Sequence, residues 1–242
     1  MDILKTKGSE SMFTHNKKLL REVKVEKVNP QYAVLLQEQL GGCNGEVKAA
    51  MQYISQSFRA KDPAMKDLFL DIGSEELSHM EMVAQTINLL NGHEVNYEKI
   101  HAGELETMTT YGLNPALINS SGNPWTADYV TVTGDLAADL LADIASEQRA
   151  KVVYEYLYRQ IDDKYVRETI MFLLEREEAH NMLFCEALNR FTKESGSNIN
   201  FGMSEDSKLY FDLSKPGRYF DNPEPKAPEM GNVGCECKNH KK

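Results

Sequence analysis

Apolar residues recur at helical spacing in four stretches of the chain. Asn29-Pro30 and Asp62-Pro63 are typical helix starts, because Pro is favoured at the first helical position and Asn or Asp caps it, whereas Gly92 is a typical stop. At 1.5 Å per residue, a helix of roughly 30 residues is about 45 Å long. The pattern predicts four such helices, over about residues 30–59, 63–91, 133–160 and 164–192.

The segments between and beyond these helices are irregular. Residues 92–131 contain Gly, Pro and Ser clusters, and a connection of that length is suited to join two long helices that run in the same direction. We therefore expect an all-α, ferritin-like four-helix bundle over residues 29–195, with one long crossover between its second and third helices. Residues 1–28 are expected to form an N-terminal extension and residues 196–242 an extended C-terminal arm.

Two of the apolar stripes are interrupted by the same motif, Glu-x-x-His. Residues three apart share one face of a helix, so each motif directs its two side chains to one place. One carboxylate also falls on the core line of each of the other two helices. The six interruptions are Glu46, Glu76 with His79, Glu147, and Glu177 with His180.

The spacing of these interruptions repeats between the two halves of the bundle. From Glu46 to Glu76 is 76 − 46 = 30 residues, and from Glu147 to Glu177 is 177 − 147 = 30. In two equal hairpins this places the four carboxylates at one level. A single Glu on a core line is usually a solvent-exposed residue of a slightly rotated helix, but six matched positions cannot all rotate out without exposing the stripes. Buried carboxylates without a counter-charge are costly, so the pattern predicts a dinuclear metal site.

The types of ligand atom limit the choice of metal ion without identifying one metal. Carboxylate and imidazole ligands suit manganese and iron, and they do not separate the two. Such a pair of one-electron metals can cycle between (II,II) and (III,III), which suits a two-electron reaction. A buried carboxylate that binds no metal could serve as a proton relay, because burial raises a Glu pKa toward neutrality.

Composition excludes several other classes. The chain has 242 residues, of which 41% are hydrophobic and 26% charged, as in ordinary globular proteins. With 27 basic and 37 acidic residues its formal charge is −10, so nucleic acid and anionic membranes are not expected partners. Four cysteines do not make a disulfide framework, and we find neither a signal-like apolar run at the start nor a membrane-length apolar stretch.

Several segments resemble the manganese (non-haem, dimanganese) catalases. They are QEQLGGCNGE at 37–46, DIGSEELSHMEM at 71–82, FLLEREEAH at 172–180, Phe13-Thr14-His15, and Asn123-Pro124-Trp125 with Tyr129-Val130-Thr131. The similarity covers roughly residues 12–195. It implies a catalase that converts hydrogen peroxide to water and dioxygen with two manganese ions per chain.

The resemblance also implies residue roles. Glu46 and His79 would ligate one manganese, Glu147 and His180 the other, and Glu76 would bridge both. Glu177 takes the position of an unligated carboxylate that shuttles protons, and Tyr53 that of an outer-sphere tyrosine. Some family members bind calcium near carboxylates equivalent to Asp67 and Asp71. Some carry a basic residue just before the third carboxylate, where this chain has Ser146.

Assembly and location are likewise implied by the resemblance alone. Family members are homohexamers in which a C-terminal arm wraps neighbours. The manganese-catalase-like proteins of bacterial spore coats are closest in style, which predicts a spore layer, with the cytoplasm as the alternative and no secretion by a signal peptide.

Two other functions use the same features. A diiron ferroxidase or rubrerythrin-like peroxidase needs the same six residues, although the two Cys-x-x-Cys pairs of a rubredoxin module are missing here. A structural coat component with a vestigial metal site is the second alternative, which the Cys235-Glu236-Cys237 tail could support by crosslinking.

Overall fold

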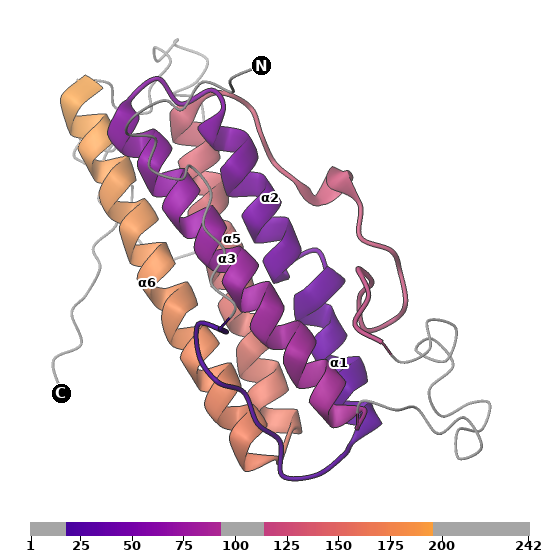
Figure 1. Ribbon diagram of the computed structural model, residues 1–242. Coiled ribbons are helices and arrows are strands. Elements are labelled where there is room, and N and C mark those ends of the chain that lie inside the picture. The colour runs from indigo at the N-terminus through magenta and orange to yellow at the C-terminus, as the bar shows by residue number, and fades with distance from the viewer. Residues whose placement is uncertain (1–17, 93–113, 196–242) are drawn as a thin grey trace, which may run out of the picture.

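The computed structural model describes residues 18–92 and 114–195, which form a helical bundle (Figure 1). In this part of the chain there is no strand, only an isolated bridge between Ile118 and Pro124. This architecture confirms the predicted all-α bundle. Its elements are α1 (Pro30–Gly41), α2 (Glu46–Ser57), α3 (Pro63–Leu90), the 3-10 helix η2 (Ala127–Tyr129), α5 (Leu136–Gln160) and α6 (Lys164–Ser195).

The predicted helix starts carry the expected caps. The Asn29 side chain accepts a hydrogen bond from the backbone N–H of Tyr32, and Asp62 accepts one from Ala64, each just before a proline at the start of a helix. At the other end of α3, Gly92 has φ +73°, a conformation that glycine adopts without strain. These local rules fix both ends of α3.

The first predicted helix is wrong in one respect, because it is broken into α1 and α2 by residues 42–45 (Figure 1). A Cβ at Gly42 would lie 2.2 Å from the carbonyl oxygen of Glu38, so only glycine permits this backbone path. The two pieces lie end to end and both pack along α3. The break lets α2 start at Glu46, whose side chain is thereby directed inward.

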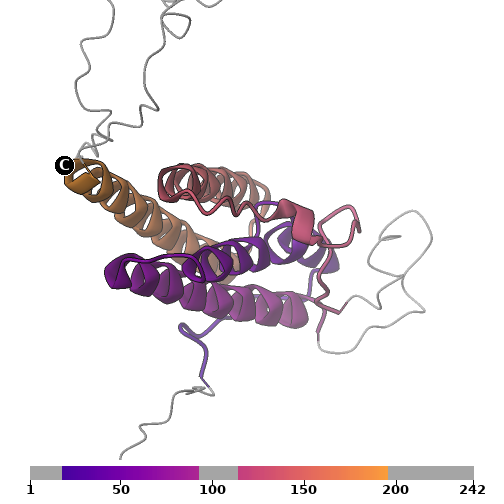
Figure 2. The ribbon, with the colours of Figure 1, turned by 90° about the horizontal axis from the view of Figure 1, so that it is seen from above.

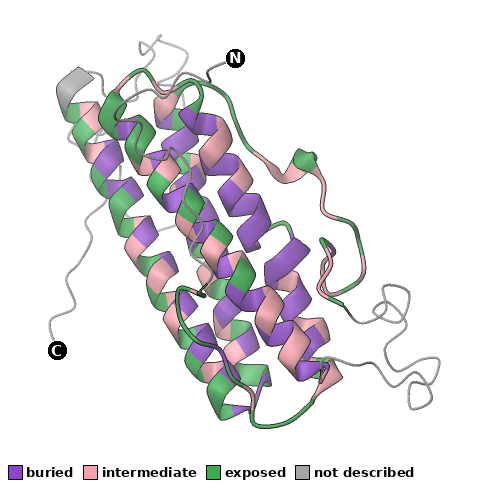
Figure 3. Cartoon of the chain, viewed as in Figure 1, coloured by how far each residue is buried: buried purple, intermediate pink, exposed green. Residues whose placement is uncertain are grey.

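The bundle consists of two paired layers (Figure 2). The α1/α2 rod packs on α3, and α5 packs on α6. Each helix turns its buried positions inward and its exposed positions outward, as Figure 3 shows. Two apolar clusters fill the interior, one around Leu36, Val83 and Leu173 and the other around Phe69, Leu140 and Phe184. They leave the middle of the bundle to polar groups.

The described end of the crossover, residues 114–135, lies along the α1/α2 rod (Figure 1). The amide of Gln37 donates to the carbonyl oxygens of Ala116 and Ile118, at 2.7 Å and 2.9 Å. A Cβ at Gly41 would lie 2.2 Å from the backbone nitrogen of Ile118, so glycine is needed for this close approach. The long connection therefore lies against α1 and α2. In the sequence it links α3 to α5, which are the second and third long helices of the prediction.

The terminal segments lie mostly outside the described residues. Residues 1–17 and 196–242 belong to this group, so the predicted N-terminal extension is described only from residue 18 and the predicted arm not at all. Val23, from the described part of the extension, is buried in the first apolar cluster. Among the described residues, no helix is both long and apolar enough to span a membrane.

Candidate metal centre

The six predicted side chains come from four different helices. Glu46 opens α2, α3 supplies a pair, α5 supplies one residue and α6 supplies a pair. All are at most 2% exposed: Glu46, Glu76, His79, Glu147, Glu177 and His180. The structure thus brings together residues that are as far apart as 180 − 46 = 134 positions in the sequence.

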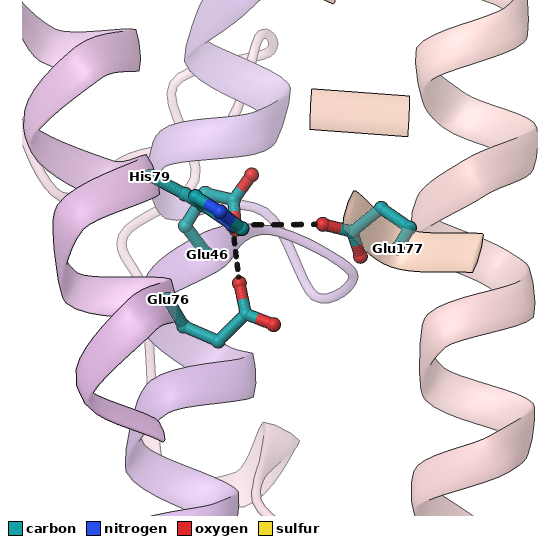
Figure 4. A group of neighbouring side chains, drawn as sticks. All are labelled: Glu46, Glu76, His79 and Glu177. Atoms are coloured by element: carbon teal, nitrogen blue, oxygen red, sulfur yellow. Dashed lines mark hydrogen bonds and ion pairs between the residues drawn. The ribbon is translucent and has the colours of Figure 1, made fainter. Parts of the chain in front are cut away.

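These side chains form two groups that could each hold a metal ion. The donor atoms of Glu46, Glu76, His79 and Glu177 lie within 4.8 Å of one another. The second group, again within 4.8 Å, contains Glu76 and Glu177 together with Glu147 and His180. Figure 4 shows the first group, in which Glu177 reaches across from α6 toward the residues on α2 and α3. Two carboxylates are therefore common to both groups.

The Glu76 carboxylate lies between the two imidazole rings. Its Oε2 is 2.9 Å from Nδ1 of His79, and its Oε1 is 2.8 Å from Nδ1 of His180. The rings themselves are stacked, with centroids 5.6 Å apart and planes inclined by 19°. Both histidines consequently turn the same nitrogen, Nδ1, toward the centre.

Two buried tyrosines complete the symmetry. The hydroxyl of Tyr53 donates to Glu147, and the hydroxyl of Tyr154 donates to Glu46, so each tyrosine contacts the carboxylate of the other helix. Burial raises the pKa of both phenols well above the usual value, which keeps them protonated donors. The family resemblance pointed to Tyr53 as an outer-sphere residue, and it pointed to no role for Tyr154. The missed signal is that each tyrosine follows its own helix's Glu by seven residues (53 − 46 and 154 − 147).

Burial controls the protonation of the carboxylates. Desolvation, with repulsion from Glu76 next in size, raises the pKa of Glu46 to about 8 and that of Glu147 to about 7. The same two causes raise the pKa of Glu177 well above its usual value. For Glu76 desolvation acts in the same direction, but the attraction of His79 and His180 outweighs it and leaves the pKa below its usual range. Desolvation lowers the pKa of the two histidines, but the surrounding carboxylates outweigh it and raise the pKa of His79 well above its usual value and that of His180 to about 10. In the metal-free centre, two protonated histidines therefore face four carboxyl groups.

A pair of divalent cations fits this environment. Glu147 Oε2 and both carboxylate oxygens of Glu177 are buried and have no hydrogen-bond partner in the described part of the chain. Four ionised carboxylates carry four negative charges, which two divalent ions balance while the histidines stay neutral. Oxygen donors with a few imidazoles suit manganese and iron better than zinc. The donor set therefore fits a dinuclear manganese centre.

Next to Glu147 lies a second polar contact. Ser146 accepts a hydrogen bond of 2.6 Å from the amine of Lys48, and only 3% of Lys48 is exposed. Burial lowers the pKa of that amine to about 8. The hydroxyl of Ser146 therefore contacts a buried amine from another helix. Sequence reasoning missed Lys48, because its burial depends on the packing of α2 against α5.

The predicted calcium residues lie elsewhere. Asp67 and Asp71 are exposed on α3. Among the described residues, neither belongs to a group of side chains positioned to hold a metal ion. Any ligand from the C-terminal segment would come from outside the described residues.

Comparison with known proteins gives one consistent family. The model of the family described as "Manganese containing catalase" matches residues 12–218. The chain is 70% identical to "Probable manganese catalase" of Clostridium acetobutylicum over 223 residues, which are 91% of this chain and 99% of that protein. It is 36% identical to "Protein CotJC" of Bacillus subtilis over 76% of this chain and 96% of that protein.

The fold has a solved counterpart. The crystal structure of wild-type KatB, a manganese catalase from Anabaena, superposes with a TM-score of 0.77 at 36% identity. The match covers 88% of this chain and 94% of that one.

Proposed function

The chain belongs to the manganese catalase family, and from this premise we propose that it dismutates hydrogen peroxide to water and dioxygen at a dimanganese centre inside its bundle. The observation that carries the proposal is the pair of buried donor groups that share Glu76 and Glu177. The ferritin-like fold predicted from the sequence agrees with that of the family. The activity and the manganese cofactor follow from membership, and the roles of single residues are our assignment.

We propose the ligand roles that the family resemblance implies. Glu46 and His79 would hold one manganese, Glu147 and His180 the other, and Glu76 would bridge the two. The contacts of 2.9 Å and 2.8 Å between Glu76 and the two Nδ1 atoms support this, because bridging requires a carboxylate with one oxygen toward each half-site. When bound, the manganese pair would supply the two-electron redox change that each half of the dismutation needs.

Glu177 is our candidate for proton transfer. Oxidation of one peroxide to dioxygen releases two protons, and reduction of the next to two waters consumes two. Burial raises the pKa of Glu177, so its carboxyl group can hold a proton near neutral pH and return it. Its oxygens have no hydrogen-bond partner among the described residues, and one lies 3.8 Å from Nδ1 of His79. The carboxylate is therefore free to turn toward a substrate in the centre.

The surrounding helices restrict what reaches this group. Apolar clusters close the bundle on both sides of the centre, and the six polar side chains are almost fully buried. Such an environment favours a small neutral substrate over a charged or bulky one, and it limits contact with bulk water.

Oxygen evolution from added peroxide, measured with purified protein whose manganese content is quantified in parallel, tests the function. We expect release of one dioxygen per two peroxides, in proportion to bound manganese. Iron occupancy with dioxygen-dependent oxidation of Fe(II) would instead favour the ferroxidase alternative. Assembly without dioxygen release would favour a structural coat component.

Assembly, location and calcium binding remain proposals that rest on the resemblance. We propose a homohexamer in which residues 196–242 contact neighbouring chains, which sedimentation of the full and truncated chains would test. A spore layer is the proposed location, with the cytoplasm as the alternative, and fractionation of spores would separate them. Calcium binding near Asp67 and Asp71 stays a prediction, to be tested by calorimetry.

A further inference from the structure

One carboxylate contacts both histidines from the side opposite to Glu76. Glu75 directly precedes Glu76 on α3, and its two oxygens lie 3.4 Å from Nε2 of His79 and 3.3 Å from Nε2 of His180. Both are ion-pair distances, and neither Nε2 atom has a hydrogen-bond partner in the described part of the chain, so Glu75 is the acceptor that faces them. The ligand roles assigned above leave Glu75 without a function.

Glu75 is itself held in place by an arginine. Nε of Arg176 donates to one oxygen of Glu75 at 2.6 Å, and one of its terminal nitrogens donates to the other at 3.2 Å. Arg176 projects from α6, so this two-pronged contact ties Glu75 to the helix that also carries His180. Such a planar pair restricts the orientation of the carboxylate more than a single contact would.

The two nitrogens of each ring contact different carboxylates. Nδ1 of both histidines points to Glu76, and Nε2 of both points to Glu75. A neutral imidazole carries one N–H, and a carboxylate can only accept hydrogen bonds. An acceptor at Nε2 therefore favours the tautomer with its proton on Nε2, which leaves the Nδ1 lone pair free for a metal.

We infer that Glu75 is a positioning residue that sets the tautomer and ring orientation of His79 and His180 together. The inference rests on the ligand roles proposed above. Because one carboxylate serves both rings, the two half-sites are coupled through a group that touches neither metal. Glu75 and Arg176 are also partly exposed, with 27% and 34% of their side chains accessible, so the coupling lies at the boundary between centre and solvent.

Glu75→Gln tests this directly. A glutamine keeps the shape but offers one acceptor and one donor, so it can support the required tautomer of only one histidine. The other ring, facing an N–H, is driven to place its proton on Nδ1, the ligand atom. We expect manganese retention against a chelator to fall about 10- to 100-fold at one half-site, a range typical for groups that support metal ligands.

Three measurements would be made on the full chain: manganese per chain after chelator competition, the electron paramagnetic resonance signal of isolated Mn(II), and thermal unfolding followed by circular dichroism. The matched control is Glu155→Gln on α5. It also removes one negative charge from an ion pair, because Glu155 lies 3.7 Å from Arg159. Arg176→Gln is the second variant. This change keeps the Glu75 carboxylate as an acceptor but removes the contact that orients it, so we expect a smaller loss of manganese retention than in Glu75→Gln.

The outcomes separate the inference from the function on which it rests. Half-loaded Glu75→Gln protein with an isolated Mn(II) signal and normal unfolding supports the role of Glu75. The inference is wrong if Glu75→Gln retains as much manganese as Glu155→Gln. If Glu75→Gln fails to fold, it is wrong if Arg176→Gln retains as much manganese as the wild-type chain. A wild-type chain that takes up no manganese contradicts the proposed function instead.

Discussion

Tyr154→Phe removes a single hydroxyl group that donates to Glu46 from the opposite helix. The ring is fully buried, so phenylalanine fills the same space and leaves no cavity of consequence. A hydrogen bond to a charged group contributes about 1.5–3 kcal/mol. If that energy is expressed in binding, manganese affinity at the half-site of Glu46 falls about 10- to 100-fold, since about 1.4 kcal/mol corresponds to a tenfold change.

The same contact determines how the loss of manganese affinity in Tyr154→Phe depends on pH. Donation from the tyrosine stabilises the ionised carboxylate, so its loss raises the already elevated pKa of Glu46, which is about 8. Protons then compete better with the metal, and the defect should be larger at pH 6.5 than at pH 8.5. Manganese affinity would be measured by chelator competition at both values.

Two further variants give this test its controls. Tyr53→Phe should produce the same loss through Glu147, because the two contacts are equivalent. Tyr156→Phe, on the same helix but 57% exposed, should change nothing. Affinity in Tyr154→Phe equal to that in Tyr156→Phe would refute the reasoning.

Three more predictions concern the centre and Asp143, a buried carboxylate on α5 that accepts hydrogen bonds from Gln52 and Gln56. Glu76→Ala or His180→Ala should remove both manganese and dioxygen release, because each change deletes a ligand; elemental analysis of a variant that keeps two manganese ions per chain would contradict this. Glu177→Gln should keep the metal but slow dioxygen release about 100-fold or more, the usual contribution of a positioned acid or base, whereas loss of manganese would move Glu177 among the ligands. Desolvation raises the pKa of buried Asp143 from 3.8 to about 8, so the metal-free native state binds the extra proton and its unfolding free energy should fall as the pH rises through that window. In Asp143→Asn this decrease in unfolding free energy between pH 5 and pH 8.5, measured by urea titration, should be smaller by up to a few kcal/mol. An unchanged decrease would show that Asp143 is ionised throughout this pH range.

The sequence alone determined the helical rods and the composition of the centre. Periodicity and caps such as Asp62-Pro63 are local, so they could be read without the fold. The Glu-x-x-His pairs were visible because polar residues at matched spacing interrupt otherwise apolar stripes. The break between α1 and α2 was not found, because Gly42 and Gly45 are tolerated in many helices, and only their close contacts with the preceding turn require glycine here.

The tertiary structure decided which groups support the centre. Tyr154 belongs to an apolar stripe by its spacing, and only the approach of α5 to α2 brings its hydroxyl to Glu46. Glu75 looks like an ordinary surface residue of α3 until α6 places His180 and Arg176 beside it. Lys48 is buried where α2 packs against α5, and there its amine donates to Ser146. Each of these roles depends on contacts between separate helices, whose relative rotation and depth of packing no single-helix periodicity specifies.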